Sequence, residues 1–331
     1  MFIVQDYSVA VLFCIVTMLC WGSWANTQKL AAGNWRFELF YWDYVIGILL
    51  FSLLLGVTLG GVGEGGRPFM QDLSQASSSN IGSALLGGLI FNLANILLVA
   101  AISIAGMSVA FPVGIGLALT IGVLTNYLQA PVGNSTLLFA GVALIVLAIL
   151  LNANAYRRMM KSTSGVSTKG LVLSVVSGCL MGFFYKYVAG SMYPDFNVPE
   201  PGKLGPYAAV FLFSVGIFIS NFLFNTLIML RPFTGEPVNY GQYFKGGAKN
   251  HLLGILGGSI WCLGMSFSII ASGKAGPAIS YGLGQGATIV AAIWGIYIWK
   301  EFKQAPKGVE NILRLMLLFY IAGLALIIMA R

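Results

Sequence analysis

Charge is what this sequence has least of. Only 8% of its 331 residues are Asp, Glu, Lys or Arg, whereas soluble globular domains carry roughly 25%. Hydrophobic residues make up 58% of the chain, and the mean hydropathy is +0.86. A soluble fold of this size could not hide so much apolar surface from water. The composition therefore excludes an ordinary soluble protein and predicts an integral membrane protein with the lipid bilayer as its partner.

Histidine and cysteine are also scarce. The only histidine, His251, stands at the start of a hydrophobic segment, and the four cysteines, Cys14, Cys20, Cys179 and Cys262, lie inside apolar stretches. We interpret the cysteines as reduced packing residues, since no disulfide or metal-ligand spacing is present. Without a cluster of ligands or a nucleophile beside a base, we expect no enzyme activity, no metal and no cofactor.

The chain also lacks the sequence Gly-x4-Gly-Lys-Ser/Thr that cradles nucleotide phosphates. No nucleotide is therefore expected as a partner. The net charge of +8 is compatible with nucleic-acid binding, but the basic residues lie in short loops. We interpret them as a topology signal and expect no nucleic acid.

Apolar segments long enough to cross a bilayer dominate the chain. A spanning helix needs about 20 apolar residues, and such segments predict ten helices and an all-α membrane protein. They fall near 8–28, 37–60, 81–104, 109–128, 136–154, 169–190, 206–230, 250–271, 277–299 and 311–330.

Basic residues are distributed unequally between the two sets of loops. One side has thirteen, namely Lys29, Arg36, Arg157, Arg158, Lys161, Lys169, Arg231, Lys245, Lys249, Lys300, Lys303, Lys307 and Arg314. The other side has four, namely Arg67, Lys203, Lys274 and Arg331. Because Lys and Arg concentrate in cytoplasmic loops, we expect both termini outside the cell and the loop 155–168 in the cytoplasm.

A weak internal similarity divides the chain into halves. Residues 101–128 resemble 267–298, and Leu137-Leu138-Phe139 recurs as Leu317-Leu318-Phe319. We therefore expect a first five-helix repeat at 1–155, a short cytoplasmic linker at 156–168 and a second repeat at 169–331. Five crossings per repeat invert the second copy, an architecture that places transporter substrates at the repeat interface near the bilayer midplane.

Several stretches of the sequence, in collinear order over most of the chain, resemble the ureide permease family of the drug/metabolite transporter superfamily. They are Trp42-Asp43-Tyr44, Arg67-Pro68-Phe69-Met70-Gln71-Asp72-Leu73-Ser74-Gln75, Leu124-Thr125-Asn126-Tyr127, Leu230-Arg231-Pro232, Ile293-Trp294-Gly295-Ile296 and Glu301-Phe302-Lys303. The glucose/ribose and rhamnose porters are a looser resemblance. The resemblance implies ten helices in two halves with outward termini. The short central loop lacks the long segment of the plant members, which implies a bacterial-type protein in the bacterial inner membrane.

Asp43 is the leading candidate for proton coupling. An ionisable side chain inside a membrane helix is costly and suggests a function, and Asp43 lies one to two turns into the second expected helix. It matches the Asp-Tyr of the family. The alternative is a structural ion pair or hydrogen bond to neighbouring helix ends. Glu38, turned about 140° from Asp43, is interpreted as an interfacial residue.

Carboxamides near the middle of the helices are candidates for substrate binding, since an amide both donates and accepts hydrogen bonds. Asn92 and Asn95 share one face of the third helix, and Asn221 and Asn225 share one face of the seventh. The alternative for each is helix–helix hydrogen bonding. Lys186 in the sixth helix either binds a substrate oxygen or extends to the membrane surface.

Aromatic side chains offer flat walls for a ring-shaped solute. The candidates are Trp21, Trp24, Tyr185, Trp261 and Tyr281, and they suit a planar ureide and a pyranose equally. Gln285 lies in a glycine-rich stretch of the ninth helix, which provides either close packing or room for a ligand.

Together these features predict a secondary active transporter. The leading hypothesis is proton-coupled import of a small neutral polar metabolite, which the family resemblance narrows to a ureide such as allantoin or a nucleobase such as uracil. The alternative is a monosaccharide transporter. Drug export, a channel and a membrane-embedded enzyme are less consistent with grouped amides and a single histidine.

Overall fold

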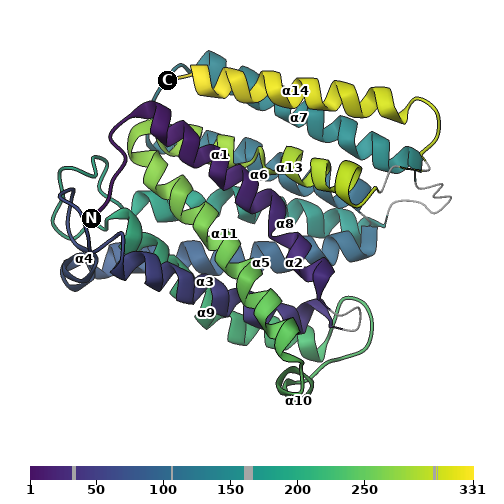
Figure 1. Ribbon diagram of the computed structural model, residues 1–331, viewed down its shortest axis with the longest axis horizontal. Helices are drawn as coiled ribbons and strands as arrows, with labels where there is room; N and C mark the ends of the chain where they lie inside the picture. The colour runs from purple at the N-terminus through teal and green to yellow at the C-terminus, as the bar shows by residue number, and fades with distance from the viewer. Residues whose placement is uncertain (32–34, 106, 160–166, 301–302, 304) are drawn as a thin grey trace.

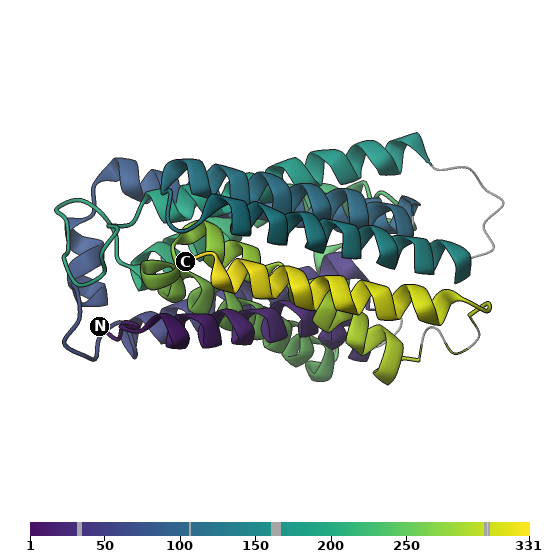
Figure 2. The same cartoon turned by 90° about the horizontal axis from the view of Figure 1, so that it is seen from above.

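The computed structural model describes residues 1–31, 35–105, 107–159, 167–300, 303 and 305–331. In these residues the chain is helical, and the one β pairing is a bridge between Met192 and Leu204. The long helices form one bundle, and both chain ends lie at the same end of it (Figures 1 and 2). In chain order the helices are α1 (Tyr7–Ser23), α2 (Ala25–Leu30), α3 (Phe37–Val57), α4 (Phe69–Gln75), α5 (Ser78–Ala105), α6 (Met107–Gln129), α7 (Ser135–Met159), α8 (Thr168–Gly190), α9 (Pro206–Leu230), α10 (Tyr240–Phe244), α11 (Ala248–Ala275), α12 (Pro277–Gly284), α13 (Ala287–Ile293), the π-helix η1 (Trp294–Ile298) and α14 (Val309–Met329).

The length and hydropathy of these helices confirm an all-α membrane protein. Nine candidate membrane spans occur within the described residues, α1 and α2 together counting as one and α12 to η1 as another. The remaining expected segment, 109–128, falls in α6, a helix of 23 residues. Each expected segment thus overlaps helical structure in the bundle.

Two names describe the ends of the bundle. We call the end where the chain begins and finishes the terminal end, and it also carries α4 (Figure 2). The opposite end carries Arg36, Arg157, Lys169 and Arg231 beside the ends of α3, α7, α8 and α9, and we call it the basic end. The expected linker 156–168 begins there, although 160–166 lie outside the described residues.

Two helix pairs cross with their backbones in close contact. A Cβ atom at Gly47 of α3 would overlap the carbonyl oxygen of Ile255 in α11, and one at Gly258 would overlap that of Tyr44. In the pair α5 and α9, the same relation joins Gly88 to Phe213 and Gly216 to Leu85. In each helix, the glycine lies three residues after the residue whose carbonyl oxygen faces the glycine of the partner helix. Such close approach is what glycine permits between membrane helices.

The helix that precedes the last one is interrupted. The sequence predicts a continuous segment at 277–299, but α12 ends at Gly284, α13 begins at Ala287 and the chain continues as η1. Gly282, Gly284 and Gly286 explain the break, because glycine in a helix interior costs about 1 kcal/mol relative to alanine. Gln285 is the residue at this interruption.

Candidate functional site

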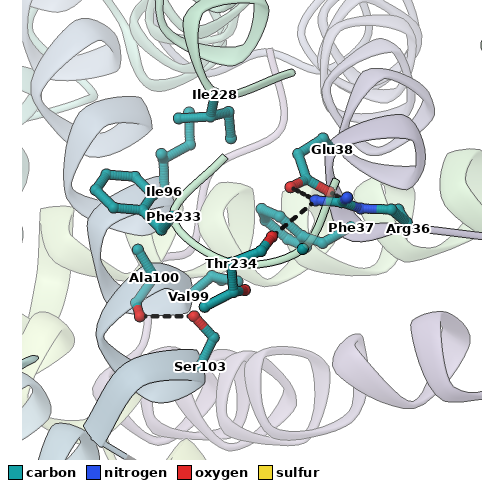
Figure 3. Close-up of a pocket in the computed structure, with 11 residues that line it drawn as sticks. Arg36, Phe37, Glu38, Ile96, Val99, Ala100, Ser103, Ile228, Phe233 and Thr234 are labelled. Atoms are coloured by element: carbon teal, nitrogen blue, oxygen red, sulfur yellow. Dashed lines mark hydrogen bonds and ion pairs between the residues drawn. The ribbon is translucent and has the colours of Figure 1, made fainter. Parts of the chain in front are cut away.

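A pocket of about 350 Å³ lies at the basic end of the bundle between α3, α5 and α9 (Figure 3). Its walls come from the first turn of α3, the last three turns of α5, the end of α9 and the segment that follows α9. The lining residues are Arg36, Phe37, Glu38, Ile96, Val99, Ala100, Ser103, Ile228, Phe233, Thr234 and Gly235. The charged, polar and apolar lining suits a small polar solute with an apolar face.

One turn deeper along each of these helices, the side chains become polar. Tyr41 follows Phe37 by four residues, and Asn92 precedes Ile96 by four, so each lies on the same helix face as a pocket residue. The Tyr41 hydroxyl donates to Asn92 Oδ1 at 2.9 Å and accepts from Asn95 Nδ2 at 3.2 Å. Asn92 Nδ2 in turn donates to Ser220 Oγ at 3.0 Å. These residues connect α3, α5 and α9 one helical turn beyond the residues that line the pocket, and we call them, with Asn221 and Asn225, the amide cluster.

Asn221 and Asn225 differ from Asn92 in their bonding. Both are fully buried in α9, on the face that leads from the pocket residue Ile228 into the bundle. Asn225 Nδ2 donates to the Glu38 carbonyl at 2.9 Å, but its Oδ1 has no hydrogen-bond partner among the described residues. Asn221 has no such partner for either amide atom. Burial of an unsatisfied polar group costs about 1–3 kcal/mol, so these two amides retain hydrogen-bonding capacity that a solute could use.

Asp43 lies on the side of α3 that faces away from Tyr41, since two residues rotate a helix by about 200°. Its side chain is buried and lies within hydrogen-bond distance of His251 of α11, whose Nδ1 is 2.9 and 3.0 Å from the two carboxylate oxygens. The Tyr243 hydroxyl of α10 donates to Asp43 Oδ1 at 2.7 Å. Burial, together with this bond to the carboxylate, raises the pKa of Tyr243, so that residue remains a donor. The sequence analysis assigned no role to His251 or Tyr243.

The His251 ring links this carboxylate to the basic end of the bundle. Its side chain is 25% exposed, against 3% for Asp43. Trp35 and Tyr243 lie edge-on to the ring, with centroids at 5.3 and 5.0 Å. A partly exposed imidazole beside a buried carboxylate can pass a proton between water and the interior.

The aromatic candidates form a wall deeper in the bundle. Trp21 and Trp261 stack with centroids 5.8 Å apart, and Phe91, which precedes Asn92, packs on Trp261 at 4.4 Å. Trp24 lies against Tyr44 at 4.6 Å. Phe91 and Tyr44, which these tryptophans contact, are neighbours of Asn92 and Tyr41, so the tryptophans pack close to the amide cluster.

Tyr185 and Tyr281 lie farther along, and their hydroxyls already have partners. Tyr185 is 3.0 Å from Ser268 Oγ, and Tyr281 donates to the carbonyls of Ala118 and Met181 at 3.2 Å. Their rings contact each other at 5.1 Å. The hydrogen bonds of these two hydroxyls thus go to residues outside the amide cluster.

Lys186 and Gln285 do not join the amide cluster. The Lys186 ammonium lies over the rings of Phe183 and Tyr187, at 5.9 and 5.8 Å from their centroids, and the residue is half-buried. Gln285 is buried at the break between α12 and α13. Across the residues that the structure describes, no group of three or more His, Cys, Asp or Glu could hold a metal ion.

Comparison with known proteins identifies relatives along the whole chain. The sequence model of the ureide permease family matches residues 40–164 and 154–330. Ureide permease 1 of Arabidopsis thaliana is 21% identical over 99% of this chain and 98% of its own length, and ureide permease 2 of the same plant is 22% identical over the same shares. One crystal structure has a TM-score of 0.62 at 14% identity and covers 96% of each chain, a likeness that shows the fold.

Proposed function

Because the chain belongs to the ureide permease family, whose members named above are permeases and not enzymes, we propose that this membrane protein is a secondary transporter of a ureide-type solute. The observation that carries the proposal is the amide cluster, in which buried Asn221 and Asn225 keep amide atoms without partners among the described residues, on the helix face that also carries the pocket residue Ile228. A ureide or a pyrimidine base presents N–H donors beside carbonyl acceptors. A carboxamide offers the complementary pair, so Asn221 and Asn225 can hold such a solute by hydrogen bonds.

The proposed architecture is ten membrane helices in two inverted halves, with α6 as the fourth helix and the halves at 1–155 and 169–331. The crossing glycines support it. Gly47 and Tyr44 in α3 correspond to Gly216 and Phe213 in α9, and Gly258 and Ile255 in α11 correspond to Gly88 and Leu85 in α5. The helix α1 packs on α11, and its proposed counterpart in the second half, α8, packs on α5, the counterpart of α11. We place the basic end in the cytoplasm of a bacterial cell, as its excess of Lys and Arg favours.

Proton coupling is proposed to occur at Asp43. Ionised, its carboxylate accepts bonds from His251 and Tyr243 and ties α3 to α10 and α11. Protonation removes the charge that holds these partners. The opposite face of α3 carries Tyr41 and the Glu38 carbonyl that binds Asn225. A movement of α3 after protonation would therefore be transmitted directly to the amide cluster.

Uptake into proteoliposomes tests the function. Labelled allantoin, uracil and a set of hexoses are supplied with and without an inward proton gradient. The proposal predicts that allantoin or uracil accumulates only with the gradient. Accumulation of a hexose alone would instead assign the site to a monosaccharide, and a leak that ignores the gradient would refute coupled transport.

Two variants separate coupling from binding. Asp43→Asn keeps a hydrogen-bonding side chain but cannot exchange a proton, so gradient-driven uptake should be lost while counterflow of the same solute continues. Asp195→Asn, which changes an exposed aspartate at the terminal end, is the matched control and should retain both. Equal loss of uptake and counterflow in Asp43→Asn would show that the residue is structural.

A further inference from the structure

An arginine at each end of the bundle binds a carboxylate of the first half and the backbone of a second-half loop. At the basic end, Arg36 forms an ion pair with Glu38 and donates to the carbonyl oxygen of Thr234 at 3.1 Å (Figure 3). It also donates to the carbonyl oxygen of Glu236. These carbonyls belong to the segment after α9 that borders the pocket. We call this group the Arg36 clasp.

At the terminal end, Arg67 makes the same set of contacts. It pairs with Asp72 Oδ1 at 2.9 Å and donates to the carbonyl oxygens of Glu200, at 3.1 Å, and Lys203, at 3.3 Å. These carbonyls lie in the loop between α8 and α9. Asp72 also accepts from the Gly205 N–H. We call this group the Arg67 clasp.

The Arg67 clasp is the tighter of the two. Its arginine and carboxylate side chains are 17% and 2% exposed, against 27% and 11% for Arg36 and Glu38. Gln75 adds two bonds between the halves, to the Lys203 carbonyl at 2.9 Å and from the Gly202 N–H at 2.7 Å. The described pocket lies at the other end, beside the more exposed Arg36 clasp.

This chemistry suits contacts that must open and close again. A guanidinium donates in several directions at once and stays charged at every physiological pH. A backbone carbonyl that leaves it can bind water instead, provided that the loop moves to the surface.

We propose that the Arg36 and Arg67 clasps are the two gates of the transport cycle, which close the cytoplasmic and external ends of the solute path. The role of a gate rests on the proposed transport function. In this structure both clasps are formed, and the described pocket lies beside the more exposed Arg36 clasp.

Cysteine accessibility tests the gates without any solute or gradient. In a background in which Cys14, Cys20, Cys179 and Cys262 are replaced, Ser272→Cys reports on the terminal end and Ala100→Cys on the basic end. Ser272 is buried near the end of α11, and its neighbour Gly273 lies under Phe196 of the α8–α9 loop. Ala100 lines the pocket and is 5% exposed. The measured quantity is the rate of alkylation by a polar maleimide in detergent micelles.

Each clasp variant should open one end only. Arg67→Gln should raise alkylation at position 272 by about tenfold, the effect of about 1.4 kcal/mol, and leave position 100 unchanged. Arg36→Gln should do the reverse. Arg314→Gln, which breaks an exposed ion pair with Glu310 on α14, is the control and should change neither rate. Equal increases at both reporters, or none at either, would refute the gates.

A second measurement covers the case in which Arg67→Gln does not fold. Gln75→Cys and Lys203→Cys are joined across the Arg67 clasp by a short bifunctional maleimide. Closing this gate should abolish solute exchange across the membrane but preserve solute binding in micelles. Continued exchange would refute the gate. If alkylation follows the prediction while no ureide is transported, the clasps stand and the proposed solute is wrong.

Discussion

Replacement of Asn221 by leucine should make the protein more stable, whereas the same replacement at Asn92 should make it less stable. Both side chains are fully buried carboxamides, and leucine has the same branching and the same number of side-chain non-hydrogen atoms as asparagine. The two sites differ only in their partners. Asn92 uses both amide atoms, with Tyr41, Ser220 and the Ile217 carbonyl. Neither atom of Asn221 has a hydrogen-bond partner in the described part of the protein.

The magnitudes follow from these partners. Leucine at position 221 removes a polar group that costs about 1–3 kcal/mol to bury unsatisfied, so the free energy of unfolding should rise by about that amount. Leucine at position 92 removes three hydrogen bonds between helices, each worth about 0.6–1.7 kcal/mol in membrane proteins. The free energy of unfolding should therefore fall by roughly 2–5 kcal/mol. Asn225→Leu removes one hydrogen bond, which lowers stability, and one unsatisfied buried oxygen, which raises it. Its free energy of unfolding should therefore lie between those of Asn92→Leu and Asn221→Leu.

The assay is equilibrium unfolding in mixed micelles of rising dodecyl sulfate content, followed by tryptophan fluorescence. Asn221→Leu should be more stable than wild type, and Asn92→Leu should be the least stable of the three variants. Asn225→Leu should lie between these two variants. A loss of stability in Asn221→Leu as large as that in Asn92→Leu would show that Asn221 has a structural partner. Its amide would then not be available to a solute.

Three further predictions concern packing, pH and coupling. Gly258→Ala and Gly88→Ala should each lower the free energy of unfolding by about 1–3 kcal/mol. Clearly unequal losses in the same unfolding assay would argue that the α3–α11 and α5–α9 crossings are not equivalent. Burial raises the pKa of Asp72, and the opposing effects of the Gly205 N–H and Arg67 are smaller. Because the pKa is then higher in the folded than in the unfolded protein, Asp72 stabilises the fold at a pH below its unfolded pKa. This stabilisation is lost as the pH rises through the folded pKa. Melting temperatures should show wild type gaining on Asp72→Asn as the pH falls from 7 toward 4, and parallel curves would contradict this. His251→Gln keeps a hydrogen-bond donor near Asp43 but lacks the imidazole ring that could carry a proton. The pH profile of gradient-driven uptake should therefore shift while counterflow persists. An unchanged profile would show that His251 is not part of the proton path.

The helices were predictable because lipid imposes a simple rule on sequence. A span of about 20 apolar residues is needed wherever the chain crosses, and the ten segments read from hydropathy coincide with helices of the bundle. Short amphipathic pieces follow no such rule. The helices α4 and α10, of seven and five residues, lie at the ends of the bundle and were not predicted.

Spacing along one helix placed Asn92 beside Asn95 and Asn221 beside Asn225, as i, i+3 and i, i+4 neighbours must be. Spacing could not show which amides already have partners. Asn92 is satisfied by Tyr41 and Ser220, which lie 51 and 128 residues away in the sequence. Only the packing of α3, α5 and α9 brings these groups together.

The partner of Asp43 was missed for the same reason. His251 is 208 residues away, and it meets the carboxylate only because Gly47 and Gly258 let α3 and α11 approach closely. A signal was nevertheless present. Asp43 and His251 are both expected near the basic end, and a lone histidine beside a membrane helix at the same depth as a carboxylate is a candidate for an ion pair.

Binding of solute to purified protein tests the central claim, that the amide cluster holds the transported molecule. Isothermal titration calorimetry in micelles would compare allantoin and uracil on wild type and on Asn221→Leu, with Arg314→Gln as a control. Wild type and the control should bind at least one of the two solutes with the same dissociation constant. Asn221→Leu should bind it about tenfold more weakly or worse, a loss of about 1.4 kcal/mol. An unchanged dissociation constant in a folded Asn221→Leu variant would contradict the account and place the solute elsewhere in the bundle.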